Sequence, residues 1–181
     1  MWGVLLVLLY FGLALMGAVI VMAPDRFRVT REGVVDAPPA RVFALINELR
    51  SWEGWSPWAK LDPRRQMTYS GPAAGAGATL EWSGDAKVGA GRLTIADSRP
   101  NEAIDIKLEF FRPRKALNDA FFRLTPEGSG TRVAWTITGR LNLVAKVTNL
   151  INSSCDKMIG PQFEQGLANL NALCGAASRA G

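Results

Sequence analysis

The sequence predicts an α+β domain in which a curved antiparallel sheet wraps around one long C-terminal helix, preceded by a single transmembrane helix. An uncharged apolar run opens the chain, short strands separated by turn residues fill its middle, and apolar residues at helical spacing close it. We therefore divide the chain into a transmembrane anchor (residues 1–24), one folded domain (residues 25–174) and a flexible tail (residues 175–181).

The apolar run at the start of the chain has the length of a membrane span. Residues Trp2 to Ala23 carry no charge and would extend about 33 Å as a helix, against a hydrocarbon core of about 30 Å. A cleaved signal peptide is the alternative, although no Lys or Arg precedes the run. Because Arg26, Arg28 and Arg31 follow it, the positive-inside rule predicts a single-pass membrane protein with its C-terminal domain in the cytoplasm.

The distribution of charge along the chain does not indicate a nucleic-acid partner. The formal net charge is +5, but the basic residues are scattered, and the sequence has no Lys/Arg block, paired-cysteine zinc pattern or aromatic RNA-binding motif. We therefore expect no nucleic acid as a partner. A positive surface suits a domain held beside an anionic membrane leaflet.

The first half of the domain reads as a strand, a helix and an aromatic segment. Phe27 to Val35 predicts a strand, and the prolines after Asp36 favour a helix start, with apolar residues at helical spacing from Ala40 to Leu49. Three tryptophans then lie between Trp52 and Trp58, around Gly and Pro, which predicts an aromatic loop or a short helical turn.

From Gln66 onward, alternating apolar residues predict antiparallel strands with one buried face each. The alternation is clearest at Ile104, Ile106, Leu108 and Phe110, and at Val133, Trp135 and Ile137.

The last part of the domain returns to helical spacing, with one apolar stripe from Val147 to Cys174. Gly160-Pro161 lies inside this stretch and predicts a kink or a break. Cys155 and Cys174 would stand roughly 28 Å apart on such a helix, whereas a disulfide needs Cα atoms within about 7 Å. We therefore expect no intramolecular disulfide.

Several segments, taken in order, resemble one known family. They are Val34-Val35-Asp36-Ala37-Pro38-Pro39, Trp52 through Trp58, Gly75-Ala76-Gly77, Glu81-Trp82-Ser83-Gly84, Gly89 to Ile95, Gly130 to Trp135 and Phe163 to Leu170. Together they resemble the polyketide cyclase/dehydrase branch of the START-like (SRPBCC) superfamily over most of residues 27–174. The resemblance implies the helix-grip fold, with a cavity between sheet and helix that holds lipids or other hydrophobic molecules in different members.

Large aromatic residues are the candidates for lining such a cavity, with packing of an ordinary core as the alternative for each ring. Met158 and Phe163 flank Gly160-Pro161, where a kink would let the helix act as a gate; a harmless bend is the other interpretation. The predicted ligand-binding residues are Trp55, Trp58, Trp82, Phe110, Trp135, Met158 and Phe163.

No catalytic constellation is recognisable in the sequence. There is no histidine, no phosphate-binding loop and no dinucleotide fingerprint, so we expect no cofactor and no metal. By alternation Glu81, Asp105 and Glu109 face away from the apolar side.

The leading hypothesis is a membrane-anchored domain that binds a hydrophobic small molecule or lipid. One alternative is a cyclase-, dehydratase- or hydrolase-like enzyme that works by positioning its substrate. The other is an interaction or stress-response module that binds a protein partner through exposed tryptophans of the Trp52 to Trp58 segment.

Overall fold

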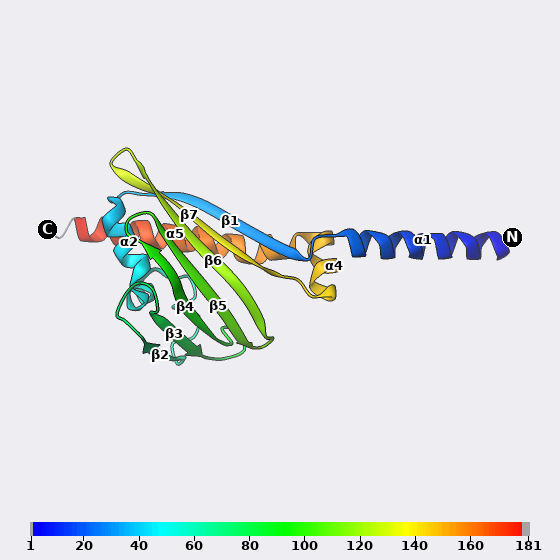
Figure 1. The fold of residues 1–181 in the computed structure, drawn as a ribbon, viewed down its shortest axis with the longest axis horizontal. Coiled ribbons are helices and arrows are strands. Elements are labelled where there is room, and N and C mark those ends of the chain that lie inside the picture. Colours follow the sequence, from blue (N-terminus) through cyan, green and yellow to red (C-terminus); the bar gives the residue numbers. More distant parts are fainter. Residues whose placement is uncertain (1, 179–181) are drawn as a thin grey trace.

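A computed structural model describes residues 2–178 and contains one seven-stranded antiparallel sheet beside a long C-terminal helix (Figure 1). The order in the sheet is β1-β7-β6-β5-β4-β3-β2, so every strand pairs with its neighbour in the chain except that β1 lies beside β7. This is the predicted fold class. The strands are β1 (Arg26–Val35), β2 (Gln66–Ser70), β3 (Thr79–Ser83), β4 (Ala90–Arg99), β5 (Ala103–Arg112), β6 (Ala116–Glu127) and β7 (Gly130–Arg140).

The predicted alternation on the strands is confirmed. Val133, Trp135 and Ile137 of β7 are all buried, and their partners Leu124, Phe122 and Ala120 on β6 are buried as well. Turn residues close the hairpins: Asn101 and Gly128 adopt positive φ angles of 63° and 58°, which Asn and Gly tolerate best. The buried face of the sheet is therefore continuous from strand to strand.

Short helices cover part of this face. α2 (Pro39–Asn47) starts with proline in its first turn and buries Val42 and Ile46. The 3₁₀ turn η1 (Leu49–Ser51) leads into α3 (Trp52–Trp55), so the aromatic segment begins as a short helical turn. α2 contacts β5, β6 and β7, and α3 contacts the closing helix.

The closing stretch forms two helices, α4 (Leu143–Asn152) and α5 (Ser154–Ser178). Of the kink or break predicted at Gly160-Pro161, the break is wrong, because both residues lie inside α5; the chain instead turns at Ser153, whose φ is 48°. α5 packs along β1, carries Cys155 and Cys174 as thiols, and continues past the predicted domain limit at residue 174 to Ser178. The predicted tail residues 179–181 lie outside the described part of the chain.

The N-terminal helix α1 (Trp2–Met22) projects from the end of the domain opposite to the C-terminus (Figure 1). Among the described residues it is the one helix long and apolar enough to cross a membrane, a property that a signal sequence would share.

Candidate functional site

The centre of the domain, between the sheet and α5, is filled by stacked aromatic rings. Trp135 on β7 lies directly opposite Phe122 on β6, with ring centroids 4.8 Å apart. Phe163 of α5 stacks on Trp135 at 3.9 Å with an interplanar angle of 7°. A ligand could not enter between these rings without separating them.

The tryptophan segment packs onto this stack. Trp52 and Trp55 are buried, and their indole N–H groups donate to the carbonyls of Ile46 and Leu45 at 2.8 and 3.2 Å. Trp58 is half-buried at the edge, with its ring 5.9 Å from that of Trp135. The segment therefore does not form the contiguous exposed patch that a docking surface of tryptophans requires. We call the six rings Trp52, Trp55, Trp58, Phe122, Trp135 and Phe163 the ring cluster.

A second aromatic pair lies apart from the ring cluster. Trp82 of β3 and Phe110 of β5 approach each other at 5.7 Å across the intervening strand β4. Gly91 lies between them in the register, and a Cβ there would stand 2.5 Å from the Trp82 ring. The missing side chain at Gly91 thus makes room for the indole, whose N–H donates to the Val88 carbonyl at 3.0 Å.

Half-buried residues surround this pair. Leu108 lies two residues before Phe110 on the same face of β5, and its partner on β6 is Asn118. The Asn118 side chain occupies space left by Gly139, and its amide makes no hydrogen bond within the described chain. We call Trp82, Leu108, Phe110 and Asn118 the apolar rim. Figure 1 shows that the β5–β6 hairpin beside it lies at the end of the domain from which α1 projects.

The predicted ligand-binding residues therefore fall into three groups. Trp55, Trp135 and Phe163 are buried in the ring cluster with Trp58 at its edge, whereas Trp82 and Phe110 belong to the apolar rim. Met158 stands apart, because 67% of it is exposed. The residues of the two groups that the sequence did not indicate as site residues are Trp52, Leu108, Asn118 and Phe122, although Leu108 and Phe122 lie on alternating strands.

An arginine on the inner face of the sheet fastens α5 to β1. Arg31 lies opposite Trp135 in the register and reaches Asp156 at 2.8 and 3.0 Å and Glu164 at 2.6 Å. Its guanidinium occupies the space beside Gly160, where a Cβ would clash with it. These hydrogen bonds raise the pKa of Arg31 and lower the pKa of Asp156. The two carboxylates flank Pro161, so the ion pairs hold both sides of the helix where proline removes a backbone donor.

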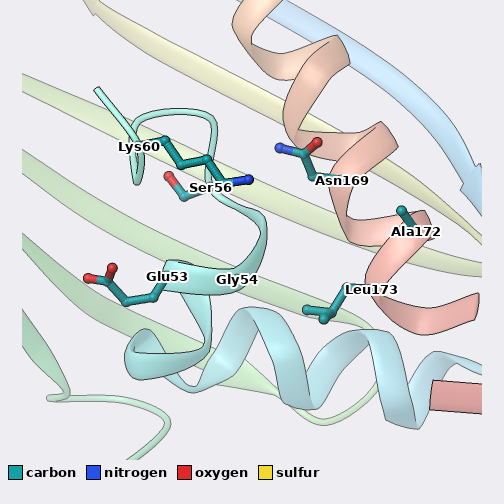
Figure 2. A pocket seen from close by; sticks show the side chains of 7 residues that line it. All are labelled: Glu53, Gly54, Ser56, Lys60, Asn169, Ala172 and Leu173. Carbon is teal, nitrogen blue, oxygen red and sulfur yellow. The ribbon is translucent and has the colours of Figure 1, made fainter. Parts of the chain in front are cut away.

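Two of the best-defined surface depressions of the described chain have no predicted ligand-binding residue in their lining. The first, of ≈ 270 Å³, lies between α3, the loop after it and α5, and combines polar side chains such as Glu53 and Lys60 with the apolar side chain of Leu173 (Figure 2). The second, of ≈ 230 Å³, follows β1 and α5 near Gly33 and Leu167. Both are open to solvent, and neither has the apolar lining of a hydrophobic binding site.

The buried polar side chains of the described chain are all engaged in structure. Asp62 accepts hydrogen bonds from the backbone of Asp85 and Arg64, which lowers its pKa. Thr131 donates to the Ala37 carbonyl, and Thr136 shares a hydrogen bond with Thr30. None of them is left without a partner. The interior therefore offers apolar contact rather than a free acid or base.

Comparison with known proteins agrees with this architecture. A family model described as polyketide cyclase/dehydrase and lipid transport matches residues 26–175. Among curated proteins, none matches the chain significantly.

Solved structures share the fold at low sequence identity. A protein from Nitrosospira multiformis is similar with a TM-score of 0.61 and 20% identity, over 84% of this chain and 99% of that one. TTHA0849 from Thermus thermophilus is similar with a TM-score of 0.58 and 24% identity, over 84% of this chain and 99% of that one. CV1439 from Chromobacterium violaceum is similar with a TM-score of 0.58 and 18% identity, over 83% of this chain and 97% of that one. These likenesses establish the helix-grip fold, which by itself does not select a function.

Proposed function

Because the chain belongs to the polyketide cyclase/dehydrase and lipid transport family, we propose that it is a membrane-anchored domain that binds a hydrophobic small molecule or lipid. The observation that carries the proposal is the apolar rim: half-buried Trp82, Leu108 and Phe110 beside the unpaired amide of Asn118. Apolar walls with a single polar group that orients the ligand are typical of small-molecule sites. In this proposal α1 spans the bilayer and the domain lies in the cytoplasm, as the arginines after α1 favour.

The ring cluster has a different role in this proposal. Its rings are in mutual contact and its buried indoles are hydrogen-bonded, so opening it would cost both packing and hydrogen bonds. The rim residues have water on one side already. A ligand therefore binds at the rim, whose residues are already half-exposed, and leaves the ring cluster closed.

The engaged state of Asp62, Thr131 and Thr136 favours binding over catalysis, since an enzyme needs an acid, base or polar group free to act on its substrate. Binding also requires no cofactor or metal.

Native mass spectrometry of the full chain, released from mild detergent, tests the proposal. We expect one hydrophobic molecule per chain in the wild type and its loss in Leu108→Asn, which adds a polar group to the rim. Leu61→Asn is the matched control, because Leu61 is an exposed apolar residue outside the rim. Lipid retained equally by both variants would be lipid around α1 and would contradict binding at the rim.

A further inference from the structure

The exposed apolar side chains of the domain gather at one end. Outside α1, the large apolar residues of the described chain that are more than half exposed have between 67% and 73% of their surface open to solvent. They occur at the start of β6, in α4 and at the start of α5, and they are Leu117, Leu143, Val144 and Met158. In Figure 1 these elements lie toward α1. Single exposed apolar residues are ordinary, but a group of them at one end of a domain indicates a partner.

Helix α4 is attached to the point where α1 ends. The Lys146 ammonium donates to the Val21 carbonyl at 3.1 Å, and the Leu141 N–H donates to the Asp25 carbonyl at 2.8 Å. Figure 1 shows α4 running across the direction of α1. If α1 follows the bilayer normal, α4 therefore lies along the membrane surface, with Leu143 and Val144 turned outward.

Basic residues at the same end lack carboxylate partners. Arg26 at the start of β1 lies directly opposite Arg140 at the end of β7, both are exposed, and neither forms an ion pair within the described chain. Like charges opposite each other destabilise a strand pair. The unpaired Arg114 and Lys115 in the β5–β6 hairpin add to the positive charge. An anionic group placed at this end would relieve the repulsion.

From these observations we infer that the α1 end of the domain is a docking surface for an anionic bilayer, with the exposed face of α4 at the boundary between headgroups and acyl chains and Arg26 and Arg140 against lipid phosphates. The inference rests on the proposed anchor. An amphipathic helix in this position gains from buried apolar area and from attraction to anionic lipid. Docking would also turn the apolar rim toward the membrane, the source of a hydrophobic ligand.

An environment-sensitive fluorophore on α4 tests the docking surface. The full chain carrying Val144→Cys, in a background with Cys155→Ser and Cys174→Ala, is labelled with acrylodan and placed as one copy per nanodisc. The nanodiscs contain either phosphatidylcholine alone or phosphatidylcholine with phosphatidylglycerol. Ser129→Cys is the matched control, because Ser129 is exposed in the β6–β7 turn away from α1.

We expect a blue shift of the label at residue 144 and none at residue 129, with a larger shift in the anionic nanodiscs. The additional blue shift in anionic nanodiscs should disappear in about 1 M salt, where the Debye length is about 3 Å. It should also fall in Arg26→Gln/Arg140→Gln but not in Arg99→Gln, a matched exposed arginine on β4.

Four outcomes would overturn the inference. A label at residue 144 that stays as water-exposed as that at residue 129 would refute docking while leaving the anchor and the ligand site intact. A shift that appears only with two chains per nanodisc would assign the surface to a second copy of the chain. Equal shifts in neutral and anionic discs would refute the contribution of anionic lipid. A chain that does not enter nanodiscs would overturn the anchor, and the docking surface with it.

Discussion

Gly166 on α5 offers a direct test of how the ring cluster is packed. A Cβ at this position would stand 2.7 Å from Cζ3 of Trp135 and 3.2 Å from Cδ of Pro57. The Trp135 ring cannot retreat, because Phe163 stacks on it at 3.9 Å and Phe122 at 4.8 Å. Gly166→Ala therefore forces a shift in a filled core.

The expected cost follows from two opposing effects. Overpacking a filled core costs about 1–3 kcal/mol, and the constrained ring favours the upper half of that range. Replacing glycine by alanine inside a helix stabilises the helix by about 1 kcal/mol. The net loss in the free energy of unfolding should be about 1–2 kcal/mol.

A double-mutant cycle isolates the contact with the ring. Trp135→Phe removes Cζ3, so Gly166→Ala in that background should be neutral or stabilise by up to about 1 kcal/mol. Gly175→Ala is the matched control, because it is the same change in the same helix and a Cβ there would meet nothing within 4 Å. Urea unfolding of the full chain in mild detergent, followed by far-ultraviolet circular dichroism, measures all of these variants. An equal cost of Gly166→Ala in both backgrounds would refute the packing described for Trp135.

Two further predictions concern the arginines that follow α1. Since Arg31 lowers the pKa of Asp156, that carboxylate stabilises the fold above its usual pKa of about 3.9 and loses this contribution as the pH falls further. The stability difference between wild type and Arg31→Gln, measured by urea unfolding across this range, should therefore shrink on acidification; a constant difference would contradict the ion pair. A C-terminal reporter active only in the cytoplasm should give a signal in the wild type and a weaker or mixed one in Arg26→Gln/Arg28→Gln, because these two arginines are exposed and carry the orientation bias without fastening α5. A signal from a C-terminal reporter that is active only outside the cytoplasm would contradict the proposed topology.

The fold followed from the sequence because its signals are local. The alternation at Val133, Trp135 and Ile137 correctly placed these residues on the buried face of β7. The spacing of the C-terminal stripe predicted a closing helix, which α4 and α5 supply. Turn residues marked the hairpins, since positive φ angles restrict the residue type.

The contacts of the site depend on partners distant in the sequence, which no local pattern reveals. Arg31 was read only as a topology signal, yet it pairs with Asp156 at a separation of 125 residues. Arg31 also pairs with Glu164, so its two partners lie on either side of Pro161 in the sequence of α5. Gly91 lies within β4, and its missing side chain accommodates a ring from β3, which no local pattern predicts.

The packing differs between the two ends of the domain, and in the proposed function this difference determines where a ligand enters. Toward α3 the rings of Trp55 and Trp135 are almost fully buried, so local opening there would expose a large apolar surface. Toward α1 the half-buried Leu108 and the unpaired amide of Asn118 have fewer contacts to lose. Arg31, opposite Trp135 in the register, fastens α5 to β1 beside the stacked rings. In the proposed function, binding at the rim therefore requires no unfolding of the ring cluster and is expected at the end of the domain that faces α1.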